Sequence, residues 1–382
     1  MKERRLIAAI TGSRGEWGYI RPVLRLIDQD PDLDYAIVAT NMHLLPEFGM
    51  SVREIEGDGF HVDERIYMTF DGYTGATMTK SLACLLLELP TALQRIKPDI
   101  ILLSGDRGEQ LMAAVAGAHL RIPVAHIQAG ELSGNVDGVV RHAITKLANI
   151  HFCANEEFAD RVRKLGEQNF RIHLTGAPLV DELVAGVITP EHELRRKYRL
   201  NEDSRLILAV QHPVTEEEGE AGEQVVETLH ALIEVGWPTI LIYPNADAGS
   251  ESIRKQLATM KRPHIRYFRN LPRADYLGLM KTASVMVGNS SSGIMEAPSF
   301  GTPSVNIGRR QKGRPQAANV INVGYSRQEI VAAIHKSVTD EMVSQARSVV
   351  NPYGDGDASK RIVDVLKSLE INEALLQKEM TY

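Results

Sequence analysis

Cysteine is scarce in this 382-residue sequence: Cys84 and Cys153 are too few for a disulfide framework or a cysteine-based zinc site. Long hydrophobic runs are missing as well, since no stretch approaches the roughly 18 apolar residues that indicate a membrane span. The first residues enter an apolar strand directly after their charges, without the pattern of a secretion signal. These absences predict a protein of a reducing compartment, with the cytoplasm as the expected location.

The sequence also has no block of consecutive lysines and arginines that would suggest a nucleic-acid or anionic-membrane surface. Its formal net charge is −6 and its pI is near 6.1, so any anionic ligand must meet a local positive site. What is present is an ordinary globular balance of 43% hydrophobic and 24% charged residues. At roughly 150 residues per domain, the length favours two domains or two halves of one large α/β unit.

Short apolar runs that end in polar loops recur along the chain, each followed by an amphipathic stretch of helical length. This pattern predicts parallel sheets covered on both faces. Strands are expected at 6–11, 35–40, 100–104, 124–128, 150–154 and 172–175 in the first half, and at 206–210, 239–243, 265–268, 285–287 and 304–307 in the second. The fold class that follows is α/β, with two Rossmann-like doubly wound domains facing a cleft.

A polar helical connector at 189–198 marks the expected boundary between these domains. We therefore predict a first domain over 1–185 and a second over 186–358. A final segment, 359–382, is expected to contain one helix that can pack back on the first domain. In open α/β sheets, ligands bind outside the carboxyl ends of the strands, so the polar residues that follow strands are the candidates for a site.

Three loops of the first domain meet this criterion. The glycine-containing loop after the first strand carries Arg14, whose guanidinium can clamp a phosphate, although an ordinary turn is the alternative. Asp106 and Arg107 follow a very apolar strand and form either a structural pair or an acid/base group with a holder of charged substrate. Glu131 and Asp137 lie in the next such loop, where paired carboxylates suit proton transfer on a sugar ring. For Asp137 a helix N-cap is the alternative.

In the second domain, His212 ends a strand, which is weak evidence by itself. Asn245, after the next strand, either binds a hydroxyl or starts a helix. The strongest signal is 287–296, which predicts a strand, a serine-rich turn and a helix whose N-terminus can bind phosphate. Glu296 in that helix suits the hydroxyls of a ribose, or is an exposed first-turn acid. The basic run 309–314 is expected to supply positive charge beside this turn.

These motifs together resemble the hydrolysing UDP-N-acetylglucosamine 2-epimerases, which comprise bacterial sialic-acid-pathway enzymes and half of a bifunctional animal enzyme. The resemblance runs in order from Thr11 to about Gly356, and the segments that carry it are Gly105–Arg107, His126–Glu131, Arg141–Lys146, Gln211–Thr215, Gly288–Gly293 and Phe300–Pro303. It implies a glycosyltransferase-B type fold, with UDP held mainly by the second domain and the sugar between the two. It also implies homodimers or homotetramers, and neither a metal nor another cofactor.

Carried over residue by residue, the resemblance implies diphosphate or nucleotide contacts for Arg14, Gly15, Arg107, His212, Ser290, Ser291 and Arg310. It implies nucleoside-side positions for Asn245 and Leu271, and a ribose-binding role for Glu296. Asp106 and Asp137 match carboxylates that the family assigns to catalysis, and His212 is expected to stabilise the phosphate side.

One position departs from the family pattern: Gln128 stands where the family has a third carboxylate, and an amide cannot act as a general base. Either Glu131 takes that role, or Gln128 orients the substrate, or this branch acts on a different sugar.

The implied reaction eliminates UDP from C1 as the C2 proton is removed, and then adds water to the resulting 2-acetamidoglycal. N-acetylmannosamine is the expected product from UDP-N-acetylglucosamine, for sialic-acid-type biosynthesis. The alternatives are the same reaction on a UDP-2,4-diacetamido-2,4,6-trideoxyhexose, a non-hydrolysing 2-epimerase and a glycosyltransferase of the same fold.

Overall fold

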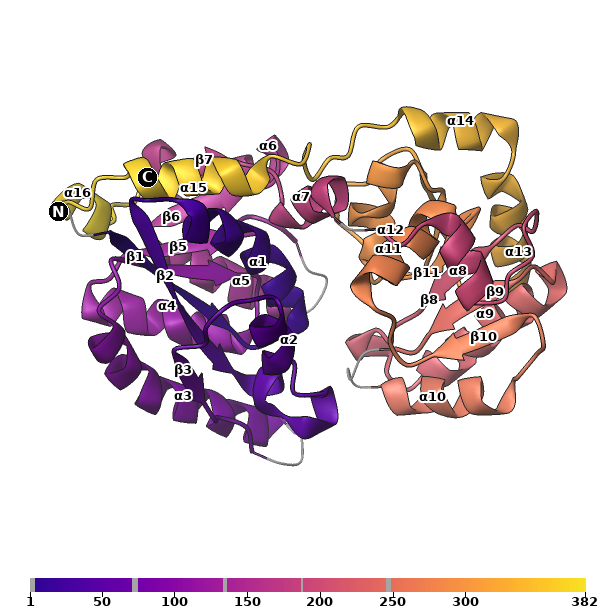
Figure 1. The fold of residues 1–382 in the computed structure, drawn as a ribbon, viewed down its shortest axis with the longest axis horizontal. Coiled ribbons are helices and arrows are strands. Elements are labelled where there is room, and N and C mark those ends of the chain that lie inside the picture. The colour runs from indigo at the N-terminus through magenta and orange to yellow at the C-terminus, as the bar shows by residue number, and fades with distance from the viewer. Residues whose placement is uncertain (1–3, 71–74, 133–135, 187, 245–248) are drawn as a thin grey trace. The chain divides into compact units, whose positions relative to one another are not determined.

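The computed structural model describes residues 4–70, 75–132, 136–186, 188–244 and 249–382 (Figure 1). The chain divides into two units. Unit 1 comprises Met1–Glu131, Val136–Glu182 and Tyr353–Tyr382, and unit 2 comprises Leu132–Asn135 and Leu183–Pro352. Each unit has one parallel sheet with helices packed on it, so the predicted fold class of two Rossmann-like α/β domains is confirmed.

The sheet of unit 1 has seven parallel strands in the order β3-β2-β1-β4-β5-β6-β7. Their bounds are β1 Arg5–Thr11, β2 Leu33–Thr40, β3 Glu64–Ile66, β4 Ile100–Ser104, β5 Val124–Ile127, β6 Ile150–Cys153 and β7 Ile172–Leu174. β1 and β4 are neighbours, with Ile7 opposite Ile100, so the strand order reverses between them. Such a switch point is where α/β sheets bind ligands.

The helices of unit 1 are α1 Arg14–Gln29, α2 Val52–Gly57, α3 Gly75–Ile96, α4 Gly108–Leu120, α5 Val136–Leu147, α6 Glu156–Lys164, α15 Ala358–Ser368 and α16 Glu373–Leu376, with α7 Pro178–Ala185 at the crossing to unit 2. α1 shows why they form: Ser13 and Glu16 make a capping box, and Ile20, Leu24 and Ile27 are buried at helical spacing. Figure 1 shows α15, from the end of the chain, beside α1.

The sheet of unit 2 has six parallel strands in the order β10-β9-β8-β11-β12-β13. The strands are β8 Ile207–Val210, β9 Thr239–Ile242, β10 Ile265–Phe268, β11 Val285–Gly288, β12 Ser304–Ile307 and β13 Val320–Val323. The helices are α8 Glu191–Lys197, α9 Ala221–Val235, α10 Ser250–Thr259, α11 Arg273–Thr282, α12 Ser292–Met295, α13 Arg327–Ser337 and α14 Asp340–Ser348. The strand order reverses between the neighbouring strands β8 and β11. The carboxyl ends of these two strands therefore form the second switch point.

Two strands and one helix differ from the prediction. β3 and β13 were not expected, because both are short edge strands whose partly exposed residues make no continuous apolar run. The single helix expected at the end of the chain is wrong, since α15 and α16 are separate. Leu369 is extended at the end of α15, and the Asn372 side chain caps α16 by accepting a hydrogen bond from the Leu375 N–H at 3.0 Å.

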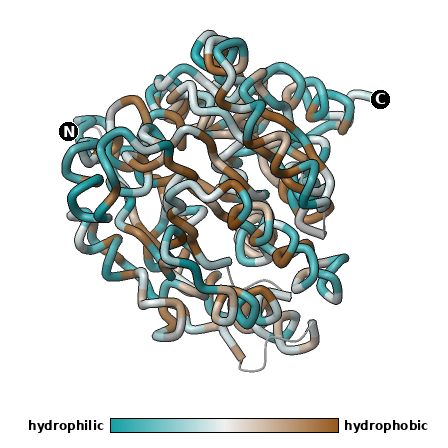
Figure 2. Tube along the Cα trace, turned by 90° about the vertical axis from the view of Figure 1, so that its right-hand side faces the viewer, coloured by the Kyte–Doolittle hydropathy of each residue, from teal (hydrophilic) through white to brown (hydrophobic). Residues whose placement is uncertain are grey.

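Hydrophobic stretches of the chain lie mainly on inner segments and hydrophilic stretches on outer ones (Figure 2). Among the described residues, no helix combines the length and the apolar character needed to span a bilayer. Within the same part of the chain, no three histidine, cysteine or carboxylate side chains are grouped to hold a metal ion.

Candidate functional site

At the switch point of unit 1, Asp106 is held by a buried arginine. Asp106 follows β4, and its side chain is 19% exposed. Arg141 projects from α5, is 2% exposed, and forms an ion pair with Asp106. Its Nη1 also donates to the backbone oxygen of Gln128 at 3.1 Å and lies 3.7 Å from Glu131 Oε2. A fixed guanidinium therefore orients one solvent-accessible carboxylate and neighbours a second, buried one.

Gln128 and Glu131 both neighbour Nη1 of Arg141 and also contact each other. The Gln128 amide nitrogen donates to Glu131 Oε2 at 3.2 Å, and its amide oxygen accepts from the Ser104 hydroxyl at 3.3 Å. Glu131 is 1% exposed, whereas Gln128 is partly exposed. The structure therefore brings Asp106, Gln128 and Glu131 together. Of these three residues, Asp106 and Gln128 are partly exposed to solvent, and Glu131 is buried.

Behind these residues lies His126, which is fully buried. Its Nε2 is 2.8 Å from the Gly105 oxygen and its Nδ1 is 3.3 Å from the Thr145 hydroxyl. Burial lowers the pKa of His126 to about 3, so the ring is neutral and Nε2 donates to Gly105. The ring thus supports the loop that carries Asp106.

Asp137 lies in the first turn of α5, which begins at Val136, and its side chain is outside the described residues. Arg141 follows four residues later on the same helix. Arg141 lies in one of the motifs quoted above, but no role of its own was predicted for it. The signal in the sequence that could have indicated its role is its position, one helical turn after the loop predicted to carry Glu131 and Asp137.

Arg14 and Arg107, the expected phosphate contacts of unit 1, already have carboxylate partners. Arg14 donates from Nε to both oxygens of Glu54, at 2.9 Å each, and Arg107 donates from Nε to Glu109 at 2.9 Å. Gly15 is not required sterically, since an added Cβ would lie 3.8 Å from its nearest neighbour, Ser13 Oγ. A phosphate at this loop would have to exchange places with these carboxylates.

A second buried carboxylate, Glu16, lies 3.9 Å from Arg107. Burial and the negative charge of Glu109 raise the pKa of Glu16 well above its usual value. Burial alone would raise the pKa of Glu109 too, but Arg107 lowers it. Glu16 and Glu109 thus share one guanidinium, and sequence reasoning singled out neither for a role.

At the switch point of unit 2, Asn289 joins the loops that follow β8 and β11. Its Oδ1 accepts from the His212 backbone N–H at 2.7 Å, and its Nδ2 donates to the His212 oxygen at 2.8 Å. Arg310 Nη1 donates to the Asn289 oxygen at 3.3 Å. The structure therefore brings His212 and Arg310 to one residue, Asn289, that the sequence analysis named only as part of a motif.

The serine-rich turn follows Asn289. The Ser290 hydroxyl is 2.9 Å from the Ser292 hydroxyl, and Ser291 precedes α12. Among the described residues, the backbone N–H groups of Ser290 and Ser291 find no acceptor. The expected helix is much shorter than predicted, because α12 spans four residues and a 3-10 turn follows it, so a helix dipole adds little here.

The basic run at 309–314 reaches the serine-rich turn and α12 through Arg310 and Arg314, but not through Arg309. Arg309 pairs with Glu217, and Arg314 donates to the Met295 sulfur at 3.4 Å. Arg310 is the member of the run that contacts Asn289.

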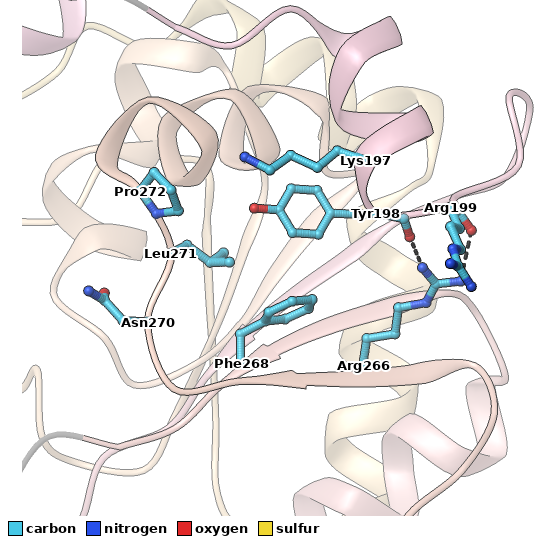
Figure 3. Close-up of a pocket in the computed structure, with 8 residues that line it drawn as sticks. All are labelled: Lys197, Tyr198, Arg199, Arg266, Phe268, Asn270, Leu271 and Pro272. Atoms are coloured by element: carbon cyan, nitrogen blue, oxygen red, sulfur yellow. Dashed lines mark hydrogen bonds between the residues drawn. The ribbon is translucent and has the colours of Figure 1, made fainter.

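Glu296 directly follows the last residue of α12, is 6% exposed, and pairs with Arg273 at 2.8 Å. The alternative of an exposed first-turn acid is therefore wrong. Leu271 is buried and lines a cavity of about 690 Å³ beside β10 (Figure 3). Phe268 and Tyr198 also line it and pack edge to face, with their ring centroids 5.3 Å apart. Asn245 lies outside the described residues.

Two parallel doubly wound sheets with polar residues at both switch points define a two-domain α/β protein of the glycosyltransferase-B type. Comparison with known proteins gives its family. The model of the UDP-N-acetylglucosamine 2-epimerase family matches residues 25–367, and the chain belongs to this family.

Two curated relatives match along almost the whole chain. A protein of Legionella pneumophila, UDP-N,N'-diacetylbacillosamine 2-epimerase (hydrolyzing), is 34% identical over 99% of this chain and 100% of its own length. A UDP-N-acetylglucosamine 2-epimerase of Neisseria meningitidis is 34% identical over 97% of both chains. Among solved structures, a Neisseria meningitidis UDP-GlcNAc 2-epimerase bound to UDP-GlcNAc has a TM-score of 0.82 at 20% identity, over 94% of this chain and 99% of the other, which supports the fold.

Proposed function

We propose that this protein is a hydrolysing 2-epimerase that converts UDP-N-acetylglucosamine and water to N-acetylmannosamine and UDP, for sialic-acid-type biosynthesis. The single observation that carries the proposal is the pairing of Asp106 with buried Arg141 at a switch point, in a chain of this family. That arrangement supplies an oriented carboxylate where a sugar's hydrogen could be removed or replaced.

In the proposed first step, the C1–O bond breaks and UDP leaves with its electron pair, while a carboxylate takes the C2 proton. The product of this step is a 2-acetamidoglycal. In the second step water adds its oxygen to C1, and a proton is delivered to C2 from the opposite face. We assign these two proton transfers to Asp106 and Asp137.

Glu131 has a supporting part in this proposal. Because it is 1% exposed and accepts from the Gln128 amide, it holds Gln128 and Arg141 in place. Gln128, which is partly exposed, then orients the substrate. This choice favours one of the three explanations for an amide at position 128.

Departure of UDP requires stabilisation of the charge that grows on its phosphates. We assign this role to Ser290, Ser291, His212 and Arg310 of unit 2, with Arg14, Gly15 and Arg107 of unit 1 as further contacts. Support comes from the N–H groups of the serine turn and from Asn289, which holds His212 and Arg310 at that turn. Leu271 and Asn245 are proposed to face the nucleoside.

The reaction can be tested by NMR of the purified protein with UDP-N-acetylglucosamine in deuterated water. We expect free UDP and N-acetylmannosamine with deuterium at C2, because the C2 proton is exchanged with solvent between the two steps. A product that stays attached to UDP would identify a non-hydrolysing epimerase instead. Transfer of the sugar to an added acceptor would identify a glycosyltransferase.

A second candidate substrate is a UDP-2,4-diacetamido-2,4,6-trideoxyhexose. The name of the Legionella pneumophila relative specifies diacetylbacillosamine, a sugar of this kind, and this supports the second candidate. The match to this chain covers the full length of that relative. Parallel assays of both nucleotide sugars would separate the two candidates by their kcat/KM values.

Glu296→Gln is expected to weaken UDP binding about tenfold, since a charge-assisted bond to a ribose hydroxyl is worth roughly 1.5 kcal/mol more than a neutral contact. Isothermal titration with UDP measures this change. Glu251→Gln, on the exposed first turn of α10, is the matched control and should bind like the wild type. Equal affinity of Glu296→Gln and the control would remove Glu296 from the ribose site.

The homodimer or homotetramer implied by the family resemblance stays a prediction, which light scattering of the purified protein can check.

A further inference from the structure

The last ten residues of the chain are bound to unit 1 by the buried side chains of Arg171 and Asn149. Arg171 is 1% exposed and donates to the backbone oxygens of Ala374, Leu375 and Gln377, at 2.6, 2.6 and 2.9 Å. The Asn149 amide also donates to Leu375, at 2.9 Å. The tail is therefore a fixed part of unit 1.

Within this tail, Lys378 lies at the C-terminal end of α5. Its ammonium donates to the backbone oxygens of Thr145, Lys146 and Ala148, at 3.1, 2.8 and 2.6 Å. The last carbonyl groups of a helix have no partner inside the helix, and positive charge is favoured there. Lys378 thus supplies both the missing donors and the charge.

Other charged groups also face Lys378. Glu167, from the loop after α6, pairs with it at 2.6 Å and also binds Lys146 and His151. Lys146 and Arg171 add positive charge nearby. Burial lowers the pKa of Lys378 to about 8, the Glu167 pair opposing this effect.

Thr145 connects this end of α5 to the proposed catalytic loop. Its backbone oxygen accepts from Lys378, while its hydroxyl is 3.1 Å from the Arg141 oxygen and 3.3 Å from His126 Nδ1. His126 in turn donates to Gly105, the residue before Asp106. A contiguous set of hydrogen bonds therefore joins the tail lysine to the backbone of Arg141 and to Gly105, whose chain neighbour Asp106 pairs with Arg141.

We propose that Lys378 is a positioning residue for catalysis: it fixes the C-terminal turn of α5 and so holds Arg141 and the Asp106 loop in register. This inference rests on the proposed function of Asp106. A small displacement of a group that transfers a proton is enough to reduce the rate of that step, whereas the proposed UDP contacts of unit 2 lie outside α5.

The test compares Lys378→Met with Lys378→Arg, which keeps the charge. We expect Lys378→Met to lower kcat about tenfold, the range typical of coupling through packed networks, with UDP affinity within twofold of wild type. Lys378→Arg should recover most of the lost kcat. The matched control is Lys367→Met, which removes a lysine of α15 that pairs with Asp30 and Asp32 at 2.9 and 2.8 Å. It should keep full kcat.

Equal kcat in Lys378→Met and the control, or a loss in Lys378→Met that Lys378→Arg does not repair, would overturn the proposal. If Lys378→Met fails to fold, a measurement on the wild type tests the proposal instead. We compare the rate of amide hydrogen exchange in the last turn of α5 with the rate in the last turn of α15. The ratio of these two rates should increase as the pH rises above about 8, where Lys378 loses its proton. An unchanged ratio would also overturn it.

The two proposals can fail separately. A wild type that releases no UDP from either nucleotide sugar would refute the proposed function, whereas the exchange ratio would still report whether Lys378 holds α5.

Discussion

Asp106→Asn is expected to lower kcat for UDP release about a thousandfold, within the range that a positioned acid or base contributes. An amide keeps the shape of the carboxylate and still offers an oxygen to Arg141, but it cannot take or return a proton. UDP affinity should remain within twofold of wild type, because the proposed phosphate contacts of unit 2 are unchanged. A coupled assay of UDP release and titration with UDP measure the two quantities.

Asp34→Asn is the matched control, since Asp34 pairs with Arg4 at the surface of the same unit and is far along β2 from the switch point. It should turn over at the wild-type rate. If Asp106→Asn kept more than about a tenth of wild-type kcat, Asp106 would not be the group that transfers the proton.

Gly288→Ala is expected to destabilise unit 2 by about 3 kcal/mol or more and to weaken UDP binding. Gly288 ends β11 at a φ of +132°, and an added Cβ would lie 2.0 Å from the Val210 oxygen of β8. Both strands carry site loops, so the clash must move either His212 or the serine turn that begins two residues later.

The two tryptophans allow unit 2 to be followed separately, because Trp237 packs on its core and Trp17 lies in unit 1. In a Trp17→Phe background, urea unfolding monitored by fluorescence reports unit 2. Gly219→Ala is the control, since an added Cβ there meets no atom within 4 Å. Equal midpoints for the two alanine variants would contradict the predicted clash at Gly288.

The central strands of both sheets could be predicted because their physical signal is local. Ile100 to Leu103 form a continuous apolar run, and all four are fully buried. β13 has no such run, since it lies at a sheet edge where Asn322 is exposed. Its pairing with β12 is decided by hydrogen bonds between segments distant in sequence.

For the site, the sequence determined which chemical groups follow the strands: the carboxyl of Asp106, the hydroxyls at 290–292 and the imidazole of His212. Their partners were decided only in the tertiary structure. Pairings such as Asp106 with Arg141, or Glu296 with Arg273, join residues on different elements, 35 and 23 positions apart.

The sequence alone therefore determined the fold class, the approximate strands and the loops that carry reactive groups, because periodicity and turn chemistry act over a few residues. Tertiary structure decided which charges neutralise one another. In the folded chain, Arg14 pairs with Glu54, Arg309 pairs with Glu217, and Lys378 binds the C-terminal end of α5. A buried or half-buried charge binds the complementary group that the fold places within reach. The identity of that group cannot be predicted from the neighbouring residues in the sequence.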